Sequence, residues 1–190
     1  MKKFTLVIAV FLLTRILDGI STYIVTPDLA AEANPLHSVF QLGWAGLFVA
    51  NLTIISLCAY ASYLYYTKPQ PISDFEAGLD YKNFISVYFF KEKGKFYKIF
   101  YTIPTNARAW IALGHIMTLS LTLYGAVILI NNTSAYYHIN NIQGLWYDLH
   151  VVLWKYHLTY GLLIPTVLGT TFVFFRYEFK KYKNQQLLAL

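Results

Sequence analysis

The 190-residue sequence contains a single cysteine, Cys58, and few charged residues. One cysteine forms no internal disulfide and supplies no metal–thiolate pattern. Charged residues make up 13% of the chain, whereas 57% is hydrophobic and 18% aromatic, which is too apolar for an ordinary soluble domain. The scarcity of charge therefore favours a membrane protein.

Long apolar runs take up most of the chain. A membrane-spanning helix needs about 20 apolar residues, and four stretches are long enough: residues 4–25, 39–66, 109–130 and 151–175. They predict an all-α fold, a four-helix polytopic membrane bundle that forms one domain over residues 1–190. The segment 67–107 is its one sizeable extramembrane part.

Lysine and arginine are absent from the segments 26–38 and 131–150. Of the fifteen cations, thirteen lie at the termini or between the second and third stretches, and only Arg15 and Lys155 lie within apolar runs. Cytoplasmic loops accumulate Lys and Arg, so we expect both chain ends and the 67–107 segment on the cytoplasmic side of an inner membrane. This topology explains the net charge of +6 without nucleic acid, and the basic side should attract anionic membrane lipids.

Local signals refine these elements. Asn34-Pro35 predicts the start of the second helix, which is expected to continue unbroken to about Tyr66. The segment 72–107 is rich in Phe and Tyr, and we expect it on the membrane surface with its aromatic side chains among the headgroups; a hairpin is the alternative. The first run has no small-x-small cleavage site, so we interpret it as a retained span.

Arg15 and Asp18 interrupt the first apolar run. Charges inside a bilayer are costly and usually face the interior of the helix bundle. The two residues lie three apart on one helix face, and Thr22 continues the polar stripe. The pair either fixes helix packing or forms a polar site that is open to the outside.

The fourth stretch carries His150 and His157, which share one helix face with Trp154. Counted at about 1.5 Å per residue, His157 and Asp18 lie at a similar depth, so they are predicted to be able to meet. Alternatively, His150 lies at the membrane interface and its side chain extends outward. His157 would then be hydrogen-bonded within the bundle.

The segment before the second helix offers Glu32, Asn34 and His37. In a functional interpretation, these side chains close over the polar site from above. In a structural interpretation, Asn34 caps the helix, and the helix dipole stabilises Glu32.

The motif Asp18-x-x-x-Thr22, followed by Glu32-x-Asn34-Pro35, resembles that of a family of small uncharacterised prokaryotic membrane proteins. Those proteins carry Asp-x-x-x-Thr near the end of a first helix and Glu-x-Asn-Pro before the second. The resemblance covers residues 13–45. It implies that these four polar residues form one cluster, and it implies no activity.

Two cofactors stay open, a metal ion and haem. Asp, Glu and His are metal-ligand types, but no HExxH, DxxD or HxxxH spacing occurs, and His150 and His157 stand about 10 Å apart along one helix. Small four-helix membrane proteins hold haem between paired histidines. Here the candidates His115 and His157 lie at opposite depths.

The third stretch contains a stripe of small residues, Gly114, Thr118, Thr122 and Gly125. Such stripes let helices approach closely. We expect this one to pack within the bundle or against a partner.

Three functions are consistent with these features. The first is a non-catalytic small subunit or scaffold of a larger membrane assembly, with other membrane proteins as partners. The second is a membrane enzyme or binding protein for a lipid-like or small anionic ligand. It would use the polar cluster, with Arg15 or Lys155 holding the anionic group and His157 carrying protons. The third is an oligomeric small transporter, although no broken helix or inverted repeat is evident.

The expected topology is testable with reporter insertions. A reporter that works only in the cytoplasm should be active when inserted between Lys91 and Lys95, because this segment is rich in lysine and cytoplasmic loops accumulate Lys and Arg. The same reporter inserted in residues 131–150 serves as the control and should be silent. The opposite pattern would contradict the assignment.

Overall fold

The computed structural model describes residues 1–29, 35–68, 75–104 and 106–187. Four long helices dominate: α1 (Lys2–Val25), α3 (Trp44–Thr67), α5 (Ala107–Ile139) and α8 (Leu163–Leu187). The shorter elements are α2 (Pro35–Ser38), α4 (Tyr81–Phe90), the 3₁₀ helix η2 (Phe96–Phe100), α6 (Leu145–Lys155) and α7 (Leu158–Gly161). These residues contain no strand, which confirms the predicted all-α fold.

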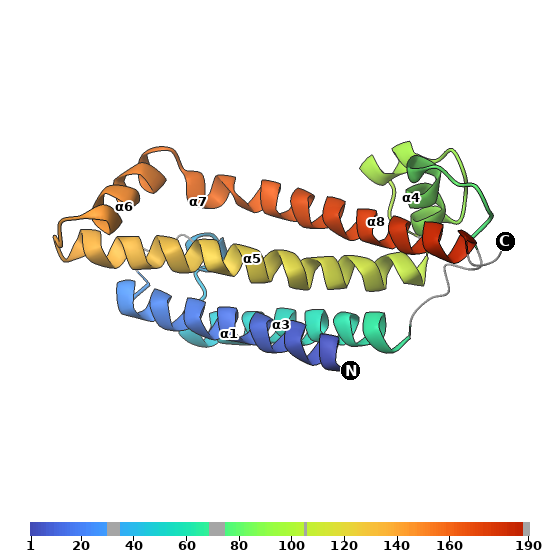
Figure 1. Cartoon of the computed structure of the whole chain (residues 1–190). Coiled ribbons are helices and arrows are strands. Elements are labelled where there is room, and N and C mark those ends of the chain that lie inside the picture. The colour runs from blue at the N-terminus through green and yellow to red at the C-terminus, as the bar shows by residue number, and fades with distance from the viewer. Residues whose placement is uncertain (30–34, 69–74, 105, 188–190) are drawn as a thin grey trace.

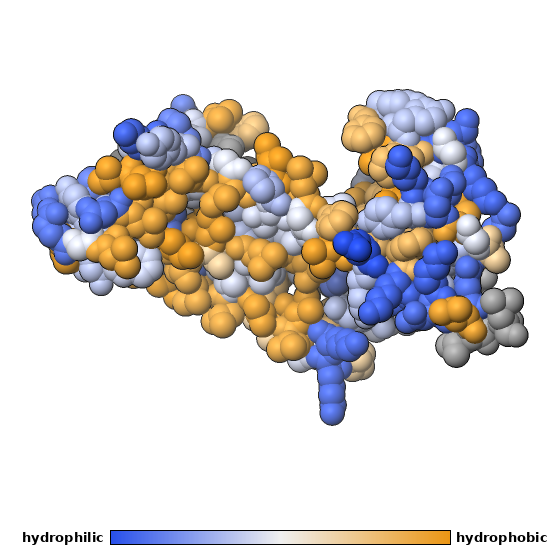
Figure 2. Space-filling model, turned by 45° about the horizontal axis from the view of Figure 1, so that its top comes forward, coloured by the Kyte–Doolittle hydropathy of each residue, from blue (hydrophilic) through white to orange (hydrophobic). Residues whose placement is uncertain are grey.

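The long helices are apolar enough to cross a membrane: Lys2–Val25, Trp44–Thr67, Ala107–Ile139, and Leu158–Leu187, which combines α7 and α8. Little of this apolar surface is covered by the protein itself; in α1, only 6% of the most apolar stretch is buried. Figure 2 shows hydrophobic side chains over the middle of the molecule and hydrophilic ones at both ends. Exposed apolar surface on this scale is unfavourable in water. The chain is therefore built as a multi-pass membrane protein.

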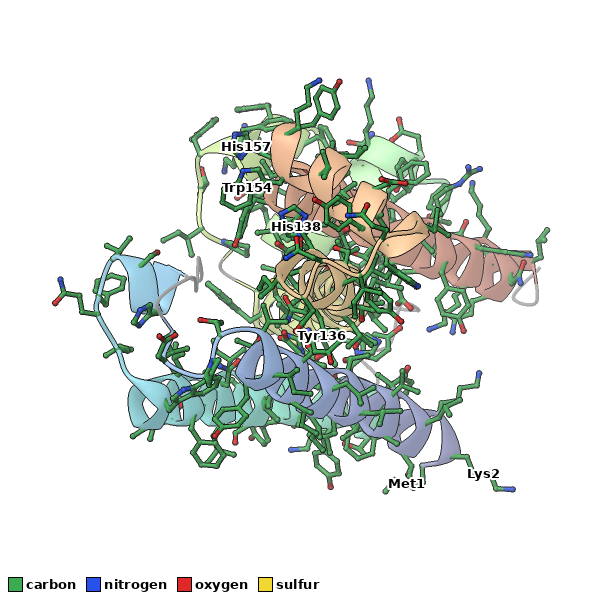
Figure 3. The ribbon with its side chains drawn as sticks, turned by 90° about the vertical axis from the view of Figure 1, so that its left-hand side faces the viewer. Met1, Lys2, Tyr136, His138, Trp154 and His157 are labelled. Atoms are coloured by element: carbon green, nitrogen blue, oxygen red, sulfur yellow. The ribbon has the colours of Figure 1, made fainter. Side chains whose placement is uncertain are left out.

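Helix α5 lies at the centre of the bundle (Figure 1). It packs against α1 and α3 on one side and against α8 on the other, as Figure 3 shows from a second direction. The further contacts of α8 are chiefly with α4 and α7. Because α1 begins and α8 ends at the end of the bundle where α4 lies, we call this end the α4 end and the opposite one the α6 end.

Two helices differ in length from the prediction. The third was expected over residues 109–130, but α5 has 33 residues, a length of about 50 Å against a hydrocarbon core of about 30 Å. The second was expected to run unbroken from Pro35 to Tyr66, but it is divided into α2 and α3. Between them Gln41 adopts a left-handed φ of 54°, and Gly43 precedes the first turn of α3.

The fourth stretch, predicted as one helix over 151–175, is broken. His157 has a left-handed φ of 50°, so α6 ends before it and α7 begins after it. No Pro or Gly marks this position in the sequence. The break is stabilised by tertiary bonds instead: Thr159 Oγ1 donates to Asn131 Oδ1 at 2.8 Å, and the Tyr124 hydroxyl donates to the Thr159 carbonyl at 3.2 Å. As a result α6 packs against α5.

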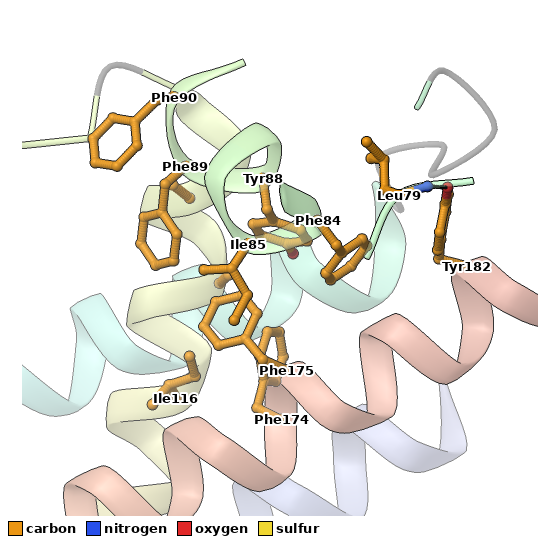
Figure 4. Packing of buried hydrophobic residues seen from close by; sticks show 12 residues of the cluster. Leu79, Phe84, Ile85, Tyr88, Phe89, Phe90, Ile116, Phe174, Phe175 and Tyr182 are labelled. Carbon is orange, nitrogen blue, oxygen red and sulfur yellow. Dashed lines mark hydrogen bonds between the residues drawn. The ribbon is translucent and has the colours of Figure 1, made fainter. Parts of the chain in front are cut away.

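The aromatic residues of α4 are buried in the protein, not among the headgroups as expected. They form a core with α5 and α8 that is shown in Figure 4 and includes Phe84, Tyr88, Phe89, Ala109, Ile116, Phe174, Phe175 and Tyr182. The Tyr182 hydroxyl donates to the Glu76 carbonyl at 2.8 Å. Because α4 is helical, the hairpin alternative is wrong. The exposed aromatic residues of this region belong to the segment around η2, such as Phe100 and Tyr101.

Two glycines of α5 allow neighbouring helices to approach closely. A Cβ atom at Gly114 would overlap the side chain of Ala61 on α3, and one at Gly125 would overlap the guanidinium group of Arg15 on α1. The absence of these two methyl groups therefore sets the spacing of α3 and α1 from α5.

The substitution Gly114→Ala is expected to lower the stability of the bundle by about 1–3 kcal/mol, because the added methyl group must push α3 away. The midpoint of thermal unfolding in detergent measures the effect. Gly19→Ala is the matched control, since nothing lies within 4 Å of a Cβ atom there, and alanine favours the helix. Equal destabilisation by the two variants would disprove the packing role.

Candidate functional site

A groove with a volume of about 1270 Å³ runs along α5, with walls from α3 and α8. Its middle is apolar and is lined by Leu119, Leu123 and Val127 of α5 and Val173 of α8. From His115 to Val127, α5 rises about 18 Å. This is close to the depth of one leaflet, half of a hydrocarbon core of about 30 Å. The groove is therefore deep enough for an acyl chain.

Small residues of α8 keep the groove open. Pro165 and Gly169 line its wall, and a Cβ atom at Gly169 would have nothing within 4 Å. A large side chain at Gly169 would therefore occupy the groove without a clash at its Cβ atom.

Positive charge gathers at the α4 end of the groove. Four cations line this end, Lys3, Lys68, Arg108 and Lys181, together with one carboxylate, Glu178. An excess of cations next to an apolar channel favours the binding of an anionic group.

The carboxylate of Glu178 is buried, with 4% of the residue exposed, and has two partners. The Tyr65 hydroxyl donates to Glu178 Oε1 at 2.7 Å, and Lys181 Nζ lies 2.6 Å from the same oxygen. Lys181 Nζ also donates to the Tyr65 hydroxyl at 3.3 Å. A buried carboxylate requires such partners, and here they join α3 to α8.

Arg108 is fixed in the first turn of α5. Its guanidinium carbon lies 4.6 Å from the ring centroid of Phe75 and 5.9 Å from that of Tyr88. Both are within the range of a cation–π interaction. The Asn106 side chain caps the helix by accepting from the Arg108 backbone N–H at 3.2 Å. The α4 region thus positions this cation beside the groove.

His115 lies about two helical turns further along α5 than Arg108 and is 3% exposed. Its ring stacks on Tyr65 with a centroid separation of 4.3 Å, and its Nδ1 lies 3.0 Å from Ser62 Oγ. Ser62 is also within 2.9 Å of Thr118 Oγ1. A polar network therefore extends from the α3–α5 interface to the wall of the groove.

Arg15 and Asp18 form a second polar region, closer to the α6 end. Arg15 Nη1 lies 3.2 Å from Asp18 Oδ2, and Arg15 Nη2 donates to the Leu121 carbonyl at 2.9 Å. The two side chains are only 12% and 22% exposed. The guanidinium group therefore bridges α1 and α5 in the space left by Gly125.

Thr22 belongs to the same α1–α5 interface. Asn132 Nδ2 donates to Ser21 Oγ at 2.9 Å and to Thr22 Oγ1 at 3.0 Å. The structure thus brings Arg15, Asp18 and Thr22 together along one face of α1. Glu32 and Asn34, predicted to complete this cluster, lie outside the described residues.

The three predicted histidines lie at separate places. His37 Nδ1 is 2.9 Å from the Leu42 carbonyl, in the connection before α3. The His150 ring packs against His138 with a centroid separation of 4.8 Å. His157, predicted to be able to meet Asp18, is exposed at the α6–α7 break, and Thr159 makes the side-chain bond from α7 to α5 instead.

The small-residue stripe of α5 faces three different neighbours. Gly114 contacts α3, where Thr118 Oγ1 also donates to the Cys58 carbonyl at 3.1 Å. Gly125 contacts α1, and Thr122 lines the groove. The stripe therefore serves both helix packing and the shape of the groove.

The described residues do not bring together the ligands considered for either cofactor. Within the described ranges no group of three or more His, Cys, Asp and Glu residues is placed to hold a metal ion. His115 lies in the half of α5 nearer the α4 end, and His157 lies at the α6 end. One haem group does not reach both.

Comparison of the chain with protein-family models, with curated proteins and with solved structures finds no match. The class that the fold and groove define is a four-span membrane protein with a groove along its central helix. The geometry of that groove carries the functional argument.

Sequence reasoning missed the residues at the cationic end of the groove. Tyr65, Glu178 and Lys181 belong to helices whose proximity no short motif reveals. One signal was available: Glu178 is the single acidic residue between positions 149 and 190, surrounded by cations. Carboxylates in membrane-spanning segments usually face the bundle interior and pair with another group.

His150 gives the α6 end a pH dependence. Burial, and then the neighbouring His138, lower the pKa of His150. The folded state thus disfavours the protonated ring, so its contribution to stability is present above the ordinary histidine pKa of about 6.5 and is lost as the pH falls below it. We expect faster hydrogen exchange of α6 amides at about pH 5 than at about pH 7.5, after correction for intrinsic rates.

The variant His150→Gln is the control for this pH effect. It keeps a polar side chain but does not titrate, so the pH dependence of exchange in α6 should disappear. If the variant retains the full dependence, another group is responsible.

Proposed function

We propose that this protein binds one anionic amphiphile, with a single acidic headgroup and at least one acyl chain, in the groove along α5. The observation that carries the proposal is the coincidence of a leaflet-deep apolar channel with a cluster of cations at one of its ends. The acyl chain would lie along Leu119, Leu123 and Val127, and the headgroup would lie beside Lys68, Arg108 and Lys181.

The shape of the groove supports an amphiphile over a small free anion. Its apolar part continues for about 18 Å beyond His115, which a free phosphate or carboxylate would leave unfilled. A volume of about 1270 Å³ also exceeds the range of about 300–1,000 Å³ usual for small-molecule sites.

The charges of the groove support an anionic headgroup over a neutral one. Four cations and one carboxylate line this end, so the lining residues carry a net charge of +3. Arg108 is only 8% exposed. A cation held away from water gains more from an anionic neighbour than an exposed one does.

The orientation follows from the same charges. The α4 end carries the lysine-rich segments, and Lys and Arg accumulate on the cytoplasmic side of membrane proteins. We propose that the α4 end faces the cytoplasm, that the membrane is the inner (cytoplasmic) membrane, and that the ligand comes from its cytoplasmic leaflet.

A role as a small subunit is the second candidate. It is favoured by the sparse coverage of α1, of whose most apolar stretch 6% is buried within the chain. A partner helix on this face would be another membrane protein. The two functions are compatible, because the groove and the exposed face of α1 are different surfaces.

Binding is tested by native mass spectrometry of protein gently extracted in detergent. Phosphatidylglycerol should bind with a one-to-one stoichiometry and at least tenfold more tightly than phosphatidylcholine. Each lysine near the surface contributes about 1 kcal/mol to the attraction of an anionic lipid. Lys68→Glu should therefore lower the affinity for phosphatidylglycerol by about fivefold or more. Water-soluble glycerol 3-phosphate should not compete.

A groove-filling variant supplies the spatial test. Gly169→Phe places a large side chain in the groove and should abolish binding, whereas Gly19→Phe makes the same change on the lipid-facing side of α1 and should not. Equal binding of both lipids, or unchanged binding to Gly169→Phe, would refute the proposal. The masses recorded also show whether a partner protein remains attached.

A further inference from the structure

The hydrogen bonds behind the groove determine which nitrogen of His115 carries a proton. Thr118 Oγ1 has one proton and donates it to a backbone carbonyl, that of Cys58 at 3.1 Å or that of Gly114 at 3.0 Å. Because a carbonyl oxygen only accepts, the arrangement with the most hydrogen bonds is the one in which Thr118 accepts from Ser62 Oγ at 2.9 Å. Ser62 thus uses its only proton on Thr118.

Ser62 is then an acceptor towards His115. The 3.0 Å contact between Ser62 Oγ and His115 Nδ1 requires a proton on Nδ1. The ring is almost fully buried, and its hydrogen-bond partner is a neutral hydroxyl, so the imidazole is neutral. In a neutral imidazole with a protonated Nδ1, Nε2 carries a lone pair and acts as an acceptor.

The acceptor nitrogen faces the groove. His115 lines the cavity, and its Nε2 atom is not fully enclosed by protein atoms. No hydrogen bond to Nε2 is present within residues 1–29, 35–68, 75–104 and 106–187. Stacking on Tyr65, with edge contacts from Tyr66 and Phe174, holds the ring in this orientation.

We infer that the amphiphile proposed above carries a hydroxyl group close to its acidic group, and that His115 selects it by accepting that hydroxyl's hydrogen bond. The inference rests on the proposed function and refines its ligand class. Lys181 Nζ lies 3.3 Å from the Tyr65 hydroxyl, and the Tyr65 ring stacks on His115. A cation for the acidic group and an acceptor for the hydroxyl therefore stand one tyrosine side chain apart.

A headgroup that offers acceptors only would leave Nε2 unpaired or facing another lone pair. A buried polar atom that loses its partner on ligand binding weakens the complex. A phosphodiester with a free hydroxyl matches both groups, whereas the same phosphodiester capped by a methyl group matches only the cation.

Two lipids of equal charge test this directly: phosphatidylglycerol, which has free hydroxyls, and phosphatidylmethanol, which has none. Native mass spectrometry of the full chain should give about fivefold tighter binding of phosphatidylglycerol, the worth of one net hydrogen bond. His115→Phe keeps the stacked ring but removes the acceptor. It should bind the two lipids with equal affinity.

Two further variants separate selection from folding. His115→Gln restores an acceptor oxygen and should recover part of the preference, whereas Ser62→Ala releases the constraint on Nδ1 and should reduce it. Retained binding of phosphatidylmethanol verifies that each variant is folded. Equal wild-type affinity for the two lipids overturns the inference but leaves the anionic-lipid proposal intact, whereas failure to bind either lipid overturns the proposed function itself.

Discussion

Helix α5 makes the main contacts of all three other long helices, and two of these contacts depend on the absence of a side chain. Ala61 of α3 occupies the space above Gly114, and the guanidinium group of Arg15 occupies that above Gly125. In lipid no hydrophobic force brings apolar helices together, so close packing and hydrogen bonds between helices must do so. Both devices are concentrated on α5.

The groove is a consequence of this central position. Since α1 and α3 share one side of α5 and α8 takes the other, the space beside α5 is left partly open. At the α4 end, Tyr65 and Glu178 join α3 to α8 and close that space with a polar network. An apolar channel with a charged end results from helix placement, and no single helix contains it.

The candidate site was only partly predictable from the sequence. The Arg15–Asp18 pair was recognisable because two charges three residues apart in an apolar run share a helix face. Its partner, the Leu121 carbonyl, is a backbone atom that no motif marks. The cationic groove was not predicted, because Tyr65 and Glu178 are 113 positions apart in the sequence. They meet only when α3 and α8 both pack against α5.

The sequence alone determined that four apolar segments form long helices, because hydropathy and segment length are local properties. The tertiary structure decided where the fourth segment breaks, because the left-handed residue His157 is stabilised by a bond between Thr159 and Asn131 that joins two helices. It also decided that the aromatic residues of α4 are buried, since apolar surface on α5 and α8 was available to cover them. Local preference sets which segments are helical, and contacts between distant residues set how they are divided and what they enclose.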